Sequence, residues 1–386
     1  MRSRITVEIS RAKGKCVGLT RSVVHFVGSA DFGGTEQALL HLVAGLNRQG
    51  WRQVVLHHPE PRLLPLLNGA HQFGVATRSV PRTTNWGSLW RLVEAVRSEQ
   101  PAIFHAHLNW PMACRTGLVV AAALGVRARV ATLQLFIGGP WPVQGRLQRF
   151  VIAPLVGRFI AVSHGVAGEL RASFGVPCSK LRVVHNGLPE DGFQDVAPIR
   201  LAEPPVVMTT ARLDPQKGLP VLLEAAASLP GVSFIIAGDG PEGPALARRA
   251  RALGVHDRVR FLGHRHDIQA LLAGCEAFAL PSMNEGLPLA ILEAMAAARP
   301  VIASAIPGIS EAVVDGETGL LFPPGDSAAL ADAIRTALAD SNRAAQLGAA
   351  GRRRARQEFS ADAMVRGVAA VYDELLTPRA PRKHIS

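Results

Sequence analysis

The chain has 386 residues, 48% of them hydrophobic and 19% charged, so it is long enough for two globular domains with well-filled cores. Its four cysteines lie far apart with no CxxC pair, which argues against a zinc site or a disulfide framework. The net charge of +12 is concentrated in residues 1–200, which hold 23 Lys and Arg against 10 Asp and Glu; with 5% aromatic residues and no recognition motif, it indicates an anionic membrane or an acidic acceptor rather than nucleic acid.

Residues 1–20 are basic but lack the apolar core of a signal peptide, so we predict an N-terminal extension there. No apolar run approaches the roughly 18 residues of a membrane span. We therefore expect a cytoplasmic protein that attaches, at most, to the inner face of the plasma membrane.

Short apolar runs alternate with helical patterns along the chain, which is typical of parallel α/β sheets. The first strands are predicted at 22–27, 52–58, 102–107, 129–134 and 159–163. A proline-rich segment without periodicity, 191–205, is predicted to be a linker. The second series of strands is predicted at 206–211, 233–238, 258–263, 277–282, 300–304 and 319–322.

This pattern predicts two doubly wound α/β domains, at 21–190 and 206–360. A C-terminal helix at 361–378 and a polar tail at 379–386 follow them. In open α/β sheets, ligands bind beyond the carboxyl ends of the strands. We therefore expect the binding site in a cleft between the two domains.

Two motifs lie at predicted strand ends of the first domain. GSADFGGT has P-loop spacing but carries Gly34 where the lysine belongs, which excludes an NTPase; Gly33 and Gly34 still let a ligand approach the backbone closely. In IFHAHL, His105 and His107 point to the same face of the sheet. We interpret His105 as a core histidine. We expect His107 to face the cleft and contact substrate; the alternative is that it too is a hydrogen-bonded core histidine.

The loop ARLDPQKG places two cations just before a predicted helix that begins near Leu219. Cations oppose the helix dipole at this end, so the arrangement favours an anion between them. Arg212 and Lys217 suit a diphosphate, the arginine by its fork and the lysine as a point charge. The alternative is an exposed lysine and an arginine paired with Asp214.

The stretch PSMNEGLPLAILEAM places carboxylates around a second helix start. Pro288 is a suitable first helical residue, so the amides of Gly286 and Leu287 should point out of the helix mouth. Glu285 at the mouth and Glu293, about 10 Å along the axis on the same side, could bind hydroxyl groups on either side of a diphosphate. The alternative is that Glu285 only complements the helix dipole and Glu293 is a solvated helix residue.

GDGPEG, from Gly238 to Gly243, follows a predicted strand and matches a dinucleotide-binding pattern. No acidic residue ends the next strand, where His264 and Arg265 stand instead. This motif leaves an NADP-dependent dehydrogenase as an alternative function.

Taken together, GGTE, ARLDPQKG, AGDGPE and E-x7-E followed by EAMAAARPVIAS resemble the family-four retaining glycosyltransferases of the GT-B fold, over roughly Val23 to Leu376. The resemblance implies two facing Rossmann-like domains with an interdomain cleft, the first binding acceptor and the second a UDP- or GDP-sugar. It implies metal-independent transfer, without a cofactor, to a cell-envelope, lipid-linked or polysaccharide acceptor. An epimerase of the same fold and a silent nucleotide-binding protein are alternatives.

The resemblance also implies a role for each motif residue. Arg212 and Lys217 would bind the diphosphate, Glu285 the sugar, Gly286 and Leu287 the phosphate, Glu293 the ribose and His264 with Arg265 the base; Gly240 would lie at the nucleotide sugar, and Gly33 and Gly34 would close over the phosphates. One departure concerns the Thr-x-His of many relatives, because ATLQLF carries Gln134 at the histidine position. Glutamine cannot take up a proton near neutral pH, so catalysis must depend on stabilising the leaving group.

The segment 146–158 is the candidate membrane surface. Arginines punctuate an apolar run there, and we expect the apolar side chains to enter the headgroup boundary while the arginines meet lipid phosphates. The residues concerned are Arg146, Arg149, Phe150, Val151, Ile152, Leu155, Val156 and Arg158.

Overall fold

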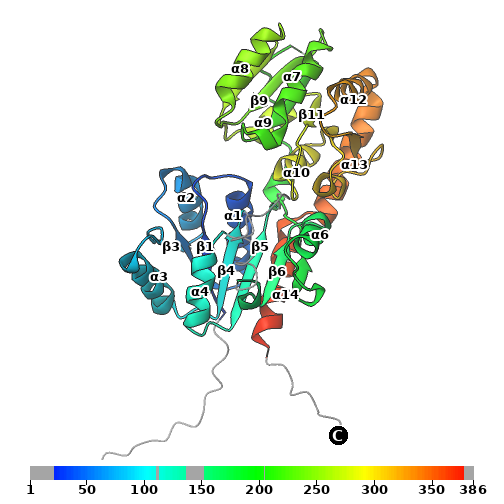
Figure 1. The fold of residues 1–386 in the computed structure, drawn as a ribbon. Coiled ribbons are helices and arrows are strands. Elements are labelled where there is room, and N and C mark those ends of the chain that lie inside the picture. The colour runs from blue at the N-terminus through cyan, green and yellow to red at the C-terminus, as the bar shows by residue number, and fades with distance from the viewer. Residues whose placement is uncertain (1–20, 110–112, 136–151, 204, 378–386) are drawn as a thin grey trace, which may run out of the picture.

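The computed structural model describes residues 21–109, 113–135, 152–203 and 205–377. They form two lobes, each built on a parallel sheet (Figure 1). The first sheet has seven strands in the order β3-β2-β1-β4-β5-β6-β7, and the second has six in the order β10-β9-β8-β11-β12-β13. Both orders reverse direction at the first strand of the domain, which is the switch point of a doubly wound fold.

The first domain begins with strands whose side chains are buried on both faces. In β1 and β4 all six residues are buried, as expected of a parallel sheet covered by helices on both sides. The strands are β1 Ser22–Val27, β2 Arg52–His57, β3 Ala76–Ser79, β4 Ile103–Leu108, β5 Ala128–Leu133, β6 Arg158–Ala161 and β7 Leu181–Val183. The helices are α1 Gly34–Arg48, α2 Leu64–Gln72, α3 Trp86–Glu99, α4 Arg115–Ala123 and α6 His164–Ala172.

Two sets of helices cover opposite faces of this sheet. α1 contacts α2, and α3 contacts α4. The chain moves outward from β1 to β3 and then crosses back to β4, so right-handed connections place α1 and α2 on one face and α3 and α4 on the other.

The second domain repeats this architecture with shorter elements. Its strands are β8 Val206–Thr210, β9 Ser233–Ala237, β10 Val259–Gly263, β11 Ala277–Leu280, β12 Val301–Ser304 and β13 Gly319–Phe322. Its helices are α7 Leu219–Ala227, α8 Gly243–Ala252, α9 Ile268–Ala273, α10 Leu289–Ala296, α11 Pro307–Ser310, α12 Ser327–Ala339 and α13 Ser341–Glu358.

The last helix, α14 Ala361–Leu376, returns to the first lobe, where it packs against α1 (Figure 1). Val365, Val368 and Tyr372 enter a buried cluster with first-domain residues that include Trp51. The same helix carries Glu374, which pairs with Arg158 at 2.5 Å. The chain therefore crosses between the lobes twice.

The predicted α/β class, with two doubly wound domains, is confirmed. All eleven predicted strands are present, but β3 and β7 were missed. Both are short edge strands in which no residue is buried, so they lack the apolar run that marks the other strands. No helix in the described part of the chain is long and apolar enough to cross a membrane.

Candidate functional site

Two loops of the second domain are joined at the carboxyl ends of β8 and β11. The backbone N–H of Met283 donates to the carbonyl of Gln216 at 2.8 Å. Gly218 adopts φ +61°, and a Cβ there would lie 2.0 Å from the carbonyl oxygen of Pro281. Only glycine fits this close approach, which fixes the lysine of the first loop beside the glutamate of the second.

Lys217 and Glu285 meet at this junction. The Nζ of Lys217 donates to Oε1 of Glu285 at 2.6 Å, and their side chains are 17% and 7% exposed. Ser282 donates to the same oxygen at 2.8 Å. A bound ligand could replace this ion pair. Its phosphate would then bind the ammonium group, and one of its hydroxyl groups would bind the carboxylate.

Arg212 contacts the first domain. Its guanidinium is 52% exposed and lies 3.2 Å from Asp31 of the first domain. Asp214, the partner expected from the sequence, lies farther away at 3.8 Å. Asp31 therefore stands where the two domains face each other, opposite the cation assigned to the diphosphate.

The start of α10 differs by one residue from the sequence prediction. Pro288 caps the helix and Leu289 is its first residue. The backbone amides of Gly286 and Leu287 have no hydrogen-bond partner among the described residues, although both residues are buried. Free amides at a helix start are suited to an anion.

Glu293 lies one turn into α10 and is partly buried. Desolvation raises the pKa of its carboxyl group to about 7. No described residue forms an ion pair or hydrogen bond with this carboxylate. An acid left without a partner in an apolar setting is a cost to stability that a hydroxyl-bearing ligand would offset.

Two glycines of GDGPEG are required because the backbone of the Arg212 loop packs directly against them. A Cβ at Gly240 would lie 2.4 Å from the carbonyl oxygen of Leu213, and one at Gly238 would lie 1.9 Å from that of Ala211. Leu213 also donates its N–H to the carbonyl of Asp239 at 2.9 Å. The glycine motif thus holds the loop of Arg212 in place.

The loop after β10 presents His264 at the surface and holds Arg265 in a fork with Asp267. The two nitrogen–oxygen distances are 2.9 and 2.6 Å, and this pairing raises the pKa of Arg265. Arg265, which stands where a dinucleotide-binding fold would carry an acidic residue, thus already has a carboxylate partner.

On the first-domain side, Gly33 caps α1 and Gly34 begins it, and both are exposed. The N–H of Gly33 donates to the carboxylate of Glu36 at 2.9 Å. That carboxylate is 3% exposed and also bonded by Ser29, and burial raises the pKa of Glu36. The amide of Gly34 has no partner among the described residues.

The Gln134 side chain is paired with Asn186, which links the first domain to the second. Its side-chain amide exchanges two hydrogen bonds with Asn186, at 3.1 and 2.8 Å, and Asn186 also donates to the carbonyl of Leu287 at 3.0 Å. A Cβ at Gly286 would lie 1.8 Å from the carbonyl oxygen of Gln134. The residue at the expected histidine position is therefore next to the loop of Glu285.

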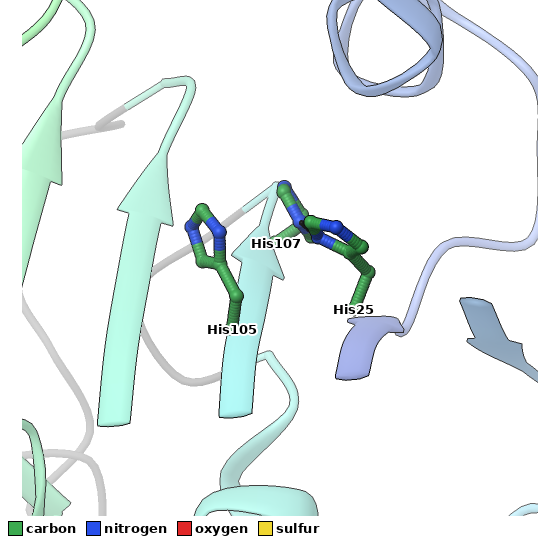
Figure 2. Close-up of side chains that lie close together, drawn as sticks. All are labelled: His25, His105 and His107. Carbon is green, nitrogen blue, oxygen red and sulfur yellow. Dashed lines mark hydrogen bonds between the residues drawn. The ribbon is translucent and has the colours of Figure 1, made fainter. Parts of the chain in front are cut away.

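The expectation that His107 faces the cleft is wrong. His107 is 3% exposed, and its Nε2 lies 3.0 Å from Nδ1 of His25. Figure 2 shows His25, His105 and His107 together on β1 and β4. Gln53 donates its amide to Val43, so its oxygen accepts from His25 Nε2, and His25 Nδ1 in turn accepts from His107.

His105 is a core histidine, as expected. Its ring nitrogens bond Tyr372 at 2.6 Å and Thr132 at 2.7 Å. Burial lowers the pKa of His25 to about 4 and those of His105 and His107 well below 6.5. The three rings are therefore neutral; His25 and His107 share a hydrogen bond, and His105 is bonded separately to Tyr372 and Thr132.

The predicted membrane surface at 146–158 is wrong where it can be tested. Ile152 and Val156 are buried in the core, and Arg158 is 8% exposed and bound to Glu374. The remaining members include four outside the described residues: Arg146, Arg149, Phe150 and Val151.

Three residues of the site were not predicted. Ser282 donates to Glu285, Asn186 bridges the domains, and Asp31 faces Arg212. Asp31 carries a usable signal, since it is an acidic residue at a strand end in a strongly basic half of the chain. Ser282 lies only three residues before Glu285, whereas the bridge from Asn186 to Leu287 joins segments 101 residues apart.

Comparisons with known proteins identify the family and the fold. The family model of glycosyl transferases group 1 matches residues 194–354, and that of glycosyltransferase family 4 matches residues 32–191. The chain is 32% identical over 291 residues to glycogen synthase of Mycobacterium tuberculosis, covering 72% of this chain and 69% of that one.

Two further relatives extend the comparison. The lipopolysaccharide core biosynthesis glycosyltransferase LpsE of Rhizobium meliloti is 37% identical over 163 residues, 42% of this chain and 48% of that one. The crystal structure of Anabaena HepE in complex with UDP and glucose superposes with a TM-score of 0.77 at 23% identity, covering 92% of this chain and all of that one. The chain therefore belongs to the group 1, family-four glycosyltransferases, enzymes of the GT-B fold that use a nucleotide sugar.

Proposed function

We propose that this enzyme transfers a sugar from a nucleotide diphosphate donor to a hydroxyl group of a cell-envelope, lipid-linked or polysaccharide acceptor, with retention of the anomeric configuration and without a metal ion. The proposal is carried by the ion pair of Lys217 with Glu285 on two second-domain loops, in the same loop as Arg212, whose guanidinium reaches Asp31 of the first domain.

The donor would bind by replacing contacts that the side chains make with one another. The diphosphate takes Lys217 from Glu285 and Arg212 from Asp31, and the freed carboxylate of Glu285 accepts hydrogen bonds from the sugar hydroxyls. The amides of Gly286 and Leu287 bind phosphate oxygens, and Glu293 accepts from the ribose. His264 borders the base, with Arg265 beside it, and Gly34 lies opposite the phosphates.

Two cations would stabilise the charge that develops on the leaving diphosphate, which is the function a divalent metal performs elsewhere. The carboxylates on the first-domain side support the proposal of retention. Asp31 keeps its ion pair with Arg62 when Arg212 leaves it for the donor, and Glu36 is bonded by Ser29 and Gly33, so neither carboxylate is poised as a free base. A front-face displacement, with the departing phosphate accepting the proton, suits this setting.

The donor and acceptor classes are drawn from relatives. HepE holds UDP and glucose, so a UDP-sugar is the first donor to test. LpsE acts in lipopolysaccharide core biosynthesis, which supports an envelope acceptor. A lipid-linked acceptor would require the enzyme to work at an anionic membrane.

Thermal-shift screening against UDP, GDP, ADP and NADP tests the donor site, because a ligand that binds the folded state raises its melting temperature. We expect a selective response to UDP or GDP and none to NADP. The sugar product formed from the responding donor should keep the donor configuration by NMR, and EDTA should not abolish its formation. Inversion, or activity that only Mg²⁺ or Mn²⁺ restores, would refute the mechanism; turnover of donor without any acceptor would identify an epimerase.

A further inference from the structure

Two tryptophans stand on the outer side of α3. Trp86 is 85% exposed and Trp90 is 63% exposed. Their spacing of four residues puts them next to each other on the helix surface. The opposite side of the helix, with Leu92 and Val96, is buried and holds α3 to the sheet. The tryptophans are therefore not needed for the core, and their exposure costs solubility.

Arginines accompany the pair. Arg91 and Arg97 are exposed on α3, and neither forms an ion pair with a described residue. Arg97 follows Trp90 by seven residues and so lies on the same side of the helix. Arg78 and Arg91, together with Glu94, line a hollow of about 280 Å³ beside α3. The +13 balance of residues 1–200 gives this half of the chain an attraction to anions.

The position of α3 suits a contact with a large surface. The helix packs against α4 and lies at the outer edge of the first lobe, away from the second domain (Figure 1). A surface bound there would leave the donor cleft open. Tryptophan is enriched where proteins meet lipid headgroups, because its ring is apolar and its N–H polar.

We propose that the outer face of α3, defined by Trp86, Trp90, Arg91 and Arg97, docks on an anionic bilayer. The indole rings enter the headgroup boundary, the arginines contact lipid phosphates, and the hollow at Arg78 and Arg91 receives one of them. This inference deepens the proposed function and rests on its lipid-linked acceptor. It places the membrane contact on α3, outside the segment 146–158.

Sedimentation of the full chain with vesicles tests the proposal. We expect binding to phosphatidylcholine vesicles that contain phosphatidylglycerol, weaker binding to phosphatidylcholine alone, and a decline as salt rises. Trp86→Ser with Trp90→Ser should weaken binding by about tenfold or more, because the apolar anchors are lost. Arg91→Glu with Arg97→Glu should weaken it on anionic vesicles by a similar factor.

Two matched controls should leave binding unchanged. Leu64→Ser removes a side chain that is 55% exposed on α2, on the opposite face of the sheet. Arg248→Glu reverses an exposed charge on α8 of the second domain. Binding of a UDP-sugar, measured without vesicles, should be the same in the tryptophan double variant and in wild type.

Equal binding to neutral and anionic vesicles, no binding to anionic vesicles at low salt, or full binding by the tryptophan double variant would overturn the proposal. So would light scattering that shows a dimer converted to monomer by the same substitutions, because the face would then join two copies of the chain. Failure of wild type to bind any nucleotide would instead refute the donor site and leave the vesicle result standing.

Discussion

Lys217 is the residue on which donor activation depends most directly. Its ammonium group is nearly buried against Glu285, and the residue lies in the same loop as Arg212. Lys217→Ala should lower kcat/KM for transfer. The loss should correspond to about 2–4 kcal/mol of transition-state stabilisation, because one charged donor to the leaving group is removed. Steady-state kinetics checks this, with Arg248→Ala as a control for loss of an exposed cation of the same domain. Activity within about threefold of wild type would contradict the diphosphate assignment.

At Glu293 we expect the requirements of donor binding and of protein stability to conflict. Its pKa of about 7 lies above the unfolded value of 4.5, so the folded state prefers the protonated form and stability falls as pH rises from about 4.5 to 7. Glu293→Gln should therefore raise the free energy of unfolding by about 1–3 kcal/mol at pH 8 and by little at pH 4.5, while it weakens donor binding. Urea unfolding at the two pH values measures this. The exposed Glu317→Gln is the control, and an equal gain at both pH values would show that the carboxylate is not the cause.

At the scale of elements, β1 and β4 carry a proton-sensitive core. The pKa values of His25, His105 and His107 are all lowered by burial, to about 4 for His25. Their stabilising contribution is present above pH 6.5 and is lost as pH falls toward 4, because unfolding lets the rings take up protons. Glu293 works in the opposite direction between pH 4.5 and 6.5.

The network predicts acid lability. Below pH 6.5 the unfolded chain binds more protons at these three rings than the folded chain does, so the free energy of unfolding should fall as the pH falls, and Glu293 offsets part of this loss. Urea unfolding at pH 7, 6 and 5 measures how steeply the free energy of unfolding changes with pH. His25→Gln should reduce that slope by the equivalent of about one bound proton. A stability that stays constant between pH 7 and 5 would mean that the rings are solvated or already charged.

At the scale of the whole molecule, α14 makes the first domain depend on the end of the chain. Tyr372 is fully buried, stacks edge-on against Trp51 and bonds His105. Tyr372→Phe keeps the ring but leaves a buried histidine nitrogen without its partner, so it should cost about 1–3 kcal/mol in the free energy of unfolding.

Calorimetry and limited proteolysis check this prediction. We expect cleavage to appear first in loops of the first domain, which α14 covers, and to leave the second domain resistant. The exposed Asp362→Ala, on the same helix, serves as the control. A Tyr372→Phe protein as stable as wild type would contradict the dependence of the first domain on α14.

The scales differ in how far the sequence determines them. Buried strands such as β1 and β4, and motif loops such as ARLDPQKG, could be predicted because they depend on local pattern: apolar runs, glycine at close approaches and a helix start after a proline. The edge strands β3 and β7 could not, because their side chains are not buried and only pairing with a neighbour makes them strands.

The sequence by itself determined the fold class, the order of the two domains and the loops that hold Arg212, Lys217 and Glu285. The tertiary structure alone decided which groups meet across those loops. It placed Asp31 opposite Arg212, bound Gln134 to Asn186, buried His107 against His25 and gave Arg158 to Glu374 on α14. Each of these pairs joins residues at least 50 positions apart, and no local pattern specifies a contact that burial and hydrogen bonding settle only once the sheets have packed.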